Sequence, residues 1–479
     1  MSLRKLATTG MVWTFAEQFG NQIVGFVISV ILARILLPEQ FGLIGMIAVF
    51  VAIGNALLNS GLNKSLIRGK DLESDDFSSV FYFNVFASVL VYLLMYVAAP
   101  FISKFFGQPI LINIVRLYCL TFIISGFSTV QSARFTKNMN FKIQTLITIP
   151  SAIIGGVTGI TLALLGYGVW SLVWSSLVTS LMNAVQLWLY SSWYPTSGFN
   201  LEKFKKHFHY GYKLTISELL DRIFQNAFLI AIGKYFSAAQ VGFYTRAETM
   251  NQLPVKNLSR ALDKVTFPLF VKIENEEKHL KSAYKRIMCT VVFVVTPVMI
   301  SLGILAEPIF RFLFTEKWLP AVPYFQVLCV TGILYPLHSY NLSVINVKGR
   351  SDLFLKLEVA KKILILLVLV VTLPFGIMAL LYGQVFISIL AFFINSHYSG
   401  RFLNYPAIKQ LLDITPILIL AAFCGVILFM VDDYFKNLGM NDFFRIFLGV
   451  MAIVSSYLLT ARLFKFDSLF EIKKLITNR

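Results

Sequence analysis

The chain has 479 residues, of which 57% are hydrophobic and only 14% are charged, and its mean hydropathy is +0.73. Soluble domains carry about 25% charged residues, so this composition excludes an ordinary globular surface and predicts a chain that lies mostly in lipid. The net charge of +18 does not indicate a nucleic-acid partner, because the cations are spread over many short segments and form no basic domain.

Long apolar segments recur along the whole chain. A membrane-spanning helix needs about 20 apolar residues, and lipid offers no hydrogen bonds to a free backbone, so each such segment is predicted to be helical. The N-terminal segment is predicted to stay as the first span, because it shows no signal-peptide cleavage site. We therefore predict an all-α, polytopic membrane protein with about fourteen transmembrane helices, at residues 11–33, 42–62, 79–102, 110–133, 143–165, 168–190, 211–233, 241–262, 287–312, 322–346, 357–374, 377–398, 411–431 and 443–463.

The distribution of Lys and Arg predicts the orientation of these spans. If both chain ends lie on the same side, the segments on that side hold 30 of the 42 Lys and Arg residues, and the loops on the other side hold seven. Positive charge accumulates on the cytoplasmic side of membrane proteins. Both termini are therefore predicted to be cytoplasmic. Two amphipathic cytoplasmic pieces, 200–209 and 465–479, are predicted to lie at the membrane interface.

Motifs for enzymatic or metal chemistry are not found. The four cysteines stand singly, and His207 and His209 have no carboxylate or cysteine at a spacing that suits a metal ion. No P-loop, G-x-S-x-G or H-E-x-x-H pattern occurs. We expect no catalytic residue, no metal and no cofactor, and hence a protein that is not an enzyme.

The sequence pattern of one helical hairpin occurs twice in the chain. The sequence ILARILLPEQFGLIG begins at residue 31, and AIGKYFSAAQVGFYT begins at residue 231, so that Gln40 and Gly42 match Gln240 and Gly242. The 200-residue offset continues in span 1, where Gln18, Asn21 and Gln22 correspond to Glu218, Asp221 and Arg222. Chance similarity between two hydrophobic hairpins is the alternative, but polar residues in register favour a duplication.

The duplication predicts two parallel copies of a six-helix unit. Six is an even number of spans, so both copies start on the same side, and the axis that relates them runs along the membrane normal. We predict domains at 1–200 and 201–400, with two extra helices and a cytoplasmic tail at 401–479. In transporters built this way, substrate binds between the halves, and rocking of the halves gives alternating access.

Several short stretches resemble a known family. They are Leu32-Ala-Arg-Ile-Leu-Leu-Pro-Glu-Gln-Phe-Gly42, Gly166-Tyr-Gly-Val-Trp-Ser-Leu-Val173, Val241-Gly-Phe-Tyr-Thr-Arg246, Leu253-Pro-Val-Lys-Asn-Leu258, Phe267-Pro268, Ala306-Glu-Pro308 and Lys317-Trp318. In order and spacing they resemble the polysaccharide transporter branch of the multidrug/oligosaccharidyl-lipid/polysaccharide superfamily, closest to the colanic-acid and O-antigen exporter type. The resemblance covers spans 1 to 10 at least.

The resemblance implies both a shape and an activity. The shape is a V formed by two six-helix lobes around a central cavity, as in multidrug transporters of the same superfamily. The activity is the movement of an undecaprenyl-pyrophosphate-linked oligosaccharide from the cytoplasmic to the outer leaflet of the bacterial inner membrane, for surface polysaccharide assembly. The prenyl tail slides through lipid, so the protein need shield only the polar head.

Ionisable residues inside the spans are the candidate site. Each costs about 2.5–3.5 kcal/mol at the bilayer centre, so a sequence keeps such groups where they face a cavity or pair with one another. Arginine suits a pyrophosphate because its planar fork donates two bonds at once. The candidate substrate-binding residues are Arg222, Arg246, Lys256, Arg260, Gln225 and Asn257, and the candidate sites for a coupling H⁺ or Na⁺ are Glu17, Glu218 and Asp221.

Two other interpretations of these charges stay open. Glu218, Asp221 and Arg222 can instead pair with each other, while Glu248 falls nearly opposite Arg246 on its predicted helix. The protein can also be a cation-coupled multidrug efflux antiporter, although the cavity of such an antiporter should be acidic or aromatic.

Two further classes of protein are less favoured. A polymerase or ligase needs larger external loops than this chain has, and a scaffold rarely keeps intramembrane charge at this energetic cost. Two lobes in one chain make a monomer sufficient.

Overall fold

The computed structural model describes residues 3–59, 61–70, 72–195 and 198–477, and their side chains except those of 3–8, 11, 59, 210, 256–265 and 475–477. All the regular structure in these ranges is helical, so the predicted all-α class is confirmed. The helices pack as two compact units, residues 1–242 and 243–479. The domain limits predicted at residues 200 and 400 follow the proposed sequence duplication, whereas the division at residue 242 follows the packing of the helices. The predicted limits therefore stay a prediction.

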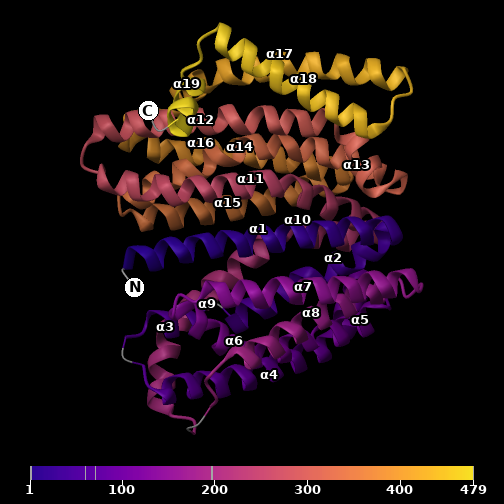
Figure 1. Ribbon diagram of the computed structural model, residues 1–479, viewed down its shortest axis with the longest axis vertical. Helices are drawn as coiled ribbons and strands as arrows, with labels where there is room; N and C mark the ends of the chain where they lie inside the picture. Colours follow the sequence, from indigo (N-terminus) through magenta and orange to yellow (C-terminus); the bar gives the residue numbers. More distant parts are fainter. Residues whose placement is uncertain (1–2, 60, 71, 196–197, 478–479) are drawn as a thin grey trace. The chain divides into compact units, whose positions relative to one another are not determined.

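Ten helices lie in the first unit, and helix α11 (Ala238–Lys272) crosses the boundary between the units (Figure 1). The helices α7 and α8 pack along each other, α1 packs on α7, and α4 packs on α6. Those of the first unit are α1 (Leu3–Ile35), α2 (Pro38–Asn59), α3 (Leu62–Arg68), α4 (Ser74–Phe106), α5 (Leu111–Tyr118), α6 (Leu120–Lys137), α7 (Phe141–Leu164), α8 (Val169–Tyr190), α9 (Leu201–Gln225) and α10 (Ala227–Tyr235).

In the second unit, α14 packs between α12 and α16, α15 packs on α16, and α17 packs between α12 and α18. One short α-helix and one 3-10 helix, α13 and η1, connect α12 to α14. The elements of this unit are α12 (Glu277–Ile304), α13 (Ala306–Phe314), η1 (Glu316–Ala321), α14 (Val322–Val347), α15 (Ser351–Thr372), η2 (Leu373–Phe375), α16 (Ile377–Phe402), α17 (Ala407–Asn437), α18 (Asp442–Leu463) and α19 (Asp467–Thr477).

Eleven helical stretches in the described residues are long and apolar enough to cross a membrane, so the chain is a multi-pass membrane protein. The predicted count of fourteen is not confirmed. The predicted spans 211–233, 241–262 and 357–374 are helical, in α9 with α10, α11 and α15, but they are not among the eleven. Their helices carry too many polar residues, as α15 does at Lys356, Glu358, Lys361 and Lys362.

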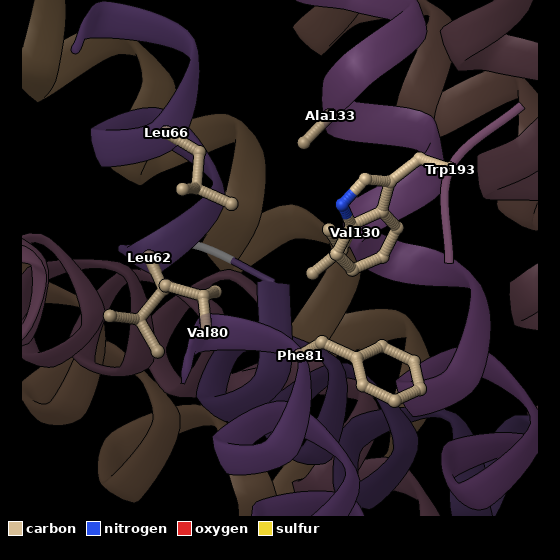
Figure 2. Close-up of a cluster of buried hydrophobic side chains, with 7 residues drawn as sticks. All are labelled: Leu62, Leu66, Val80, Phe81, Val130, Ala133 and Trp193. Atoms are coloured by element: carbon tan, nitrogen blue, oxygen red, sulfur yellow. The ribbon is translucent and has the colours of Figure 1, made fainter. Parts of the chain in front are cut away.

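The first unit contains a hydrophobic core of mostly aliphatic side chains. Its buried side chains come from α3, α4, α6 and the segment after α8, which contributes Trp193 (Figure 2). The Trp193 carbonyl accepts a hydrogen bond of 3.1 Å from the Gln131 amide. The core fixes the short helix α3 against the long helices, and it consists of Leu62, Leu66, Val80, Phe81, Val130, Ala133 and Trp193.

Beside this core, a buried histidine ties α9 to α3 and α4. The Nε2 of His207 lies 3.0 Å from Asp76 Oδ1, and its Nδ1 lies 2.7 Å from Ser65 Oγ. An ionised carboxylate only accepts, so Nε2–H donates to Asp76 and the Ser65 hydroxyl donates to Nδ1. The predicted interfacial piece 200–209 is therefore the first part of α9, anchored by His207.

The two copies of the repeated hairpin have the same local structure. In the first copy the Gln40 side chain accepts a hydrogen bond of 3.0 Å from the Leu37 backbone, and in the second the Gln240 side chain accepts one of 3.1 Å from Ser237. Each glutamine thereby satisfies a backbone N–H that the start of its helix leaves free. The conserved register of the hydrogen bond supports duplication over chance similarity.

The two hairpins also touch each other through their glycines. A Cβ atom on Gly42 would overlap the Ala238 carbonyl oxygen, and a Cβ on Gly242 would overlap the Pro38 carbonyl oxygen. Each glycine thus meets the residue that stands four positions before the other glycine. The two contacts are therefore equivalent under the 200-residue offset of the repeat. Only glycine allows backbones to approach so closely.

Ion pairs hold the ends of α13, α17 and α18 together. The Arg445 guanidinium is buried and donates to both carboxylate oxygens of Asp432, at 3.0 and 2.9 Å, and to Asp442 at 3.1 Å. Nearby, Lys436 and Arg311 donate to Glu307, at 3.0 and 2.7 Å. The Lys436 hydrogen bond, reinforced by Arg311, holds the pKa of Glu307 below its usual value although burial opposes this.

Replacing Gly42 by alanine tests the hairpin contact. The added Cβ meets backbone atoms, which no change of rotamer relieves, so G42A should lower the thermal unfolding midpoint in detergent by several degrees. The matched control is Gly25 in α1, where a Cβ meets no atom within 4 Å. G25A should leave the midpoint unchanged or raise it, because alanine favours a helix by about 0.5–1 kcal/mol over glycine. Equal midpoints for the two variants would contradict the contact.

Candidate functional site

A cavity lined by both polar and apolar side chains lies in the second unit, between α11, α14, α15 and α16. It consists of two adjoining hollows of about 440 Å³ and 180 Å³. The larger hollow opens between α14, α15 and α16, and the smaller one reaches α11. Both hollows are lined by the same five residues, which join them into one site: Thr331, Tyr335, His338, Gln384 and Ser388.

Hydrogen bonds between neighbouring helices set the positions of these side chains. The His338 Nε2 of α14 lies 2.8 Å from Ser388 Oγ of α16. The Gln384 amide of α16 donates to the Tyr244 hydroxyl of α11 at 3.1 Å. Gly332 allows α14 to approach α11 closely, since a Cβ there would lie only 2.8 Å from the Asn251 carboxamide oxygen. Three helices are thus held at fixed spacing around the cavity.

Several buried polar atoms at the cavity have no hydrogen-bond partner among the described residues. They are the Oδ1 of Asn251, the Nδ1 of His338 and both amide atoms of Asn395. The Asn395 side chain is fully buried, and Asn251 is 7% exposed. An unsatisfied buried polar group costs about 1–3 kcal/mol, so these atoms are suited to a ligand or water that supplies the missing bonds.

The charges at the cavity are few and partly neutralised. The Glu248 carboxylate accepts a hydrogen bond of 2.9 Å from the Gln252 amide one turn further along α11. Lys361 forms an ion pair with Glu358 on α15. The described residues around the cavity therefore combine one carboxylate and one paired ammonium with amides, hydroxyls, an imidazole and a tyrosine ring. Such a lining recognises polar, uncharged groups.

Arg246, a predicted substrate-binding residue, lies on a different face of α11 from Glu248. Its side chain is buried, and its guanidinium carbon lies 4.9 Å from the Phe314 ring centre and 5.1 Å from the Trp318 ring centre. A cation over two aromatic faces is stabilised by their π electrons. Arg246 and Glu248 point to different sides of α11, as their two-residue spacing on a helix predicts. Glu248 lines the cavity, and Arg246 does not.

The other predicted residues of α11 are Lys256, Asn257 and Arg260, and their side chains lie outside the described part of the structure. Their role in binding stays a prediction. The helix itself runs through this region without interruption from Ala238 to Lys272, with Pro254 and Pro268 inside it.

The predicted residues of α9 lie in the first unit. Arg222 donates a hydrogen bond of 3.1 Å to Glu218, and Lys64 of α3 lies 3.9 Å from the same carboxylate. The side chain of Arg222 is 46% exposed, and Gln225, one turn below, is exposed as well. Asp221 is half-buried. The pairing of Glu218 with Arg222 is the internal neutralisation that the sequence left open, and it leaves the arginine accessible.

Glu17, the remaining predicted ion-coupling residue, lies between α1 and α7. The Thr148 hydroxyl of α7 donates to it over 3.5 Å, a long hydrogen bond. Glu17 belongs to the first unit and Glu248 to the second, so each unit carries a half-buried carboxylate within its helices.

Sequence reasoning missed the residues that line the cavity. Gln384 and Ser388 stand four residues apart on one face of their helix, but nothing in the sequence links this face to His338. They meet only because α14 and α16 pack side by side. Glu248 did carry a signal, since it stands opposite Arg246 in a segment that was already predicted to be functional.

A larger hollow of about 750 Å³ lies between α12, α17 and α19, where both signs of charge meet. Lys285 forms an ion pair of 2.8 Å with Asp413, and Arg286 lies 3.7 Å from Glu471. These pairs neutralise one another within the protein, so the cavity between α11, α14, α15 and α16 is the better candidate site.

Comparison with known proteins places the chain in a family. A sequence model described as "Polysaccharide biosynthesis protein" matches residues 31–323, which is more than half of the chain. The chain belongs to this polysaccharide biosynthesis family. It is similar to the teichuronic acid biosynthesis protein TuaB of Bacillus subtilis (strain 168), with 27% identity over 467 residues that cover 95% of each chain.

A second relative and a solved structure extend the comparison. The succinoglycan biosynthesis transport protein ExoT of Rhizobium meliloti (strain 1021) is 26% identical over 337 residues, covering 70% of this chain and 68% of that protein. The fold is similar to that of the lipid II flippase MurJ in an inward closed conformation, with a TM-score of 0.73 over 95% of this chain and 98% of that one. The two sequences are only 14% identical, so this likeness is evidence about the fold of the present chain and not about its activity.

Substituting Arg246 and Arg222 compares the stability contributed by a buried arginine with that contributed by an exposed one. R246M removes a cation from between two aromatic rings, an interaction worth about 2 kcal/mol when desolvated, and should lower the thermal unfolding midpoint clearly. R222M removes only an exposed pair one helical turn apart, worth about 0.3–0.5 kcal/mol, and should change the midpoint little. Thermal unfolding of both variants in the same detergent measures this. Equal shifts would mean that the aromatic rings do not stabilise Arg246.

Proposed function

We propose that this protein is a flippase, which moves undecaprenyl-pyrophosphate-linked oligosaccharide units from the cytoplasmic to the outer leaflet of the bacterial inner membrane for surface polysaccharide assembly. The observation that carries the proposal is a cavity among the helices of the second unit, lined in part by amide, hydroxyl and imidazole groups. Membership of the polysaccharide biosynthesis family supports it, as do the transport protein ExoT and the fold likeness to a lipid flippase.

The orientation follows from the charge bias. With both termini in the cytoplasm, the repeated hairpins with Gly42 and Gly242 lie at the outer end of their helices, and the segments with most of the Lys and Arg face the cytoplasm. The glycine contact then closes the outer end between the two hairpins. Release of a glycan to the outside requires this contact to open, which is the step that alternating access demands.

The predicted charges take specific roles in this proposal. Arg222 is exposed, and with Arg246 and the residues Lys256 and Arg260 it provides positive charge for the pyrophosphate, assisted by Gln225 and Asn257. Glu17, Glu218 and Asp221 are the proposed sites for a coupling proton or sodium ion. Transport proceeds without a catalytic step, and one chain with two repeats suffices as a monomer.

Multidrug efflux is the second candidate function, and one observation favours it. The cavity contains the Glu248 carboxylate and the Tyr335 ring, a combination that suits organic cations. Against it, the cavity also contains many neutral hydrogen-bonding groups, and several of them have no partner among the described residues. A hydrophobic cation would leave these groups unsatisfied.

Deleting the gene distinguishes the two functions. A flippase mutant should accumulate lipid-linked repeat units on the cytoplasmic leaflet, because synthesis continues and transport stops. The measurement labels the glycan with a membrane-impermeant reagent in right-side-out and inverted membrane vesicles. Survival on cationic dyes, the readout for efflux, should stay unchanged. An unaltered leaflet distribution together with dye sensitivity would overturn the flippase in favour of efflux.

A further inference from the structure

The cavity of the second unit is poorly matched to a pyrophosphate. Its described lining contains no arginine, and its one lysine, Lys361, is already paired with Glu358. The Glu248 carboxylate would repel an anion. A diphosphate needs several donors with net positive charge, so the cavity favours a different part of the substrate.

The lining instead matches the chemistry of a neutral sugar. A sugar ring presents hydroxyl groups that both donate and accept hydrogen bonds, together with an apolar face of C–H groups. The cavity provides the amides of Gln252, Gln384 and Asn395 and the hydroxyl of Ser388, which also do both. The Tyr335 ring is 41% exposed and offers a flat apolar surface. The larger hollow is in the volume range of small-molecule pockets.

The unpartnered buried atoms point to a ligand rather than to packing. Asn395 is fully buried in α16 with neither amide atom bonded, and it lies at the larger hollow. Asn251 Oδ1 and His338 Nδ1 are unsatisfied at the smaller one. An apolar side chain would stabilise the free protein better at these positions, so their polarity serves a bound molecule.

We propose that the cavity between α11, α14, α15 and α16 is a sugar-binding subsite, which takes an uncharged sugar residue of the lipid-linked glycan while the pyrophosphate binds elsewhere. This inference rests on the proposed flippase function. It makes the second unit the part of the protein that selects the glycan, and it assigns that selection to Gln252, His338, Gln384, Ser388 and Asn395, none of which the sequence singled out.

Replacing Asn395 by leucine tests the subsite. N395L removes two unsatisfied polar atoms while roughly keeping the volume, so the thermal unfolding midpoint should stay or rise. Affinity for the glycan-bearing prenyl pyrophosphate, extracted from cells that lack the gene, should fall about tenfold, the equivalent of one or two hydrogen bonds. Affinity for glycan-free undecaprenyl pyrophosphate should stay within about twofold. Binding to purified protein in detergent measures both.

The matched control is Thr296 in α12 of the same unit. Its hydroxyl is also buried without a partner, but it is not among the cavity residues. T296V is nearly isosteric and should leave both affinities unchanged. A second variant at the other wall, Q252L, loses the carboxamide whose N–H donates to Glu248, and it should weaken glycan binding as N395L does.

The outcomes separate the two proposals. If the wild-type protein binds the glycan-bearing lipid and N395L and Q252L bind it equally well, the subsite is overturned and the flippase stands. Equal losses for the glycan-bearing and glycan-free lipids would also overturn it, since the cavity would then bind the pyrophosphate. If the wild-type protein binds neither lipid, the flippase falls and the subsite falls with it.

Discussion

The lipid interior cannot satisfy a polar group, and this constraint shapes every level of the structure. It forces the backbone into helices, since only a helix satisfies its own hydrogen bonds within one segment. It also favours partners for charged side chains that are buried within the helices. Arg445 is held by Asp432 and Asp442, and Arg246 lies against Phe314 and Trp318. Asn395, whose amide has no partner among the described residues, lies at a cavity.

The same constraint changes how helices associate. Lipid tails are as apolar as leucine, so helices gain little from hiding apolar surface and depend on close packing instead. The hairpins of the two repeats meet through Gly42 and Gly242, where each glycine admits a carbonyl group of the other copy. A contact of backbone against backbone is tight but uses few side chains. Such a contact closes well and can open without breaking a buried ion pair.

The sequence was sufficient for the fold class and for the local structure of the repeated hairpin, because both depend on signals that are local or periodic. Composition and apolar length predicted a helical membrane protein, and the register of Gln40 with Gln240 predicted a shared hairpin that the hydrogen bonds reproduce. The number of spans was less predictable, since α15 combines an apolar half with Lys356, Lys361 and Lys362. Such a helix is long enough to span a membrane but too highly charged to be identified as a span.

The candidate site was the least predictable part. His338 on α14 and Gln384 on α16 are far apart in sequence, and only the packing of three helices brings them to one cavity. The predicted charges have separate surroundings: Arg222 is exposed beside Glu218, and Arg246 is packed against rings. A division of labour is consistent with this arrangement, in which charge holds the pyrophosphate and neutral groups hold the sugar.

The central claim is that this protein by itself carries a glycan head across a bilayer while the prenyl anchor stays in lipid. The most direct test places the purified protein in vesicles that contain the extracted lipid-linked oligosaccharide on both leaflets. A membrane-impermeant reagent then consumes the glycan on the outside. The account predicts that all of the glycan is consumed over time when the protein is present, and about half when it is absent. Consumption that stops at half in both preparations would contradict it.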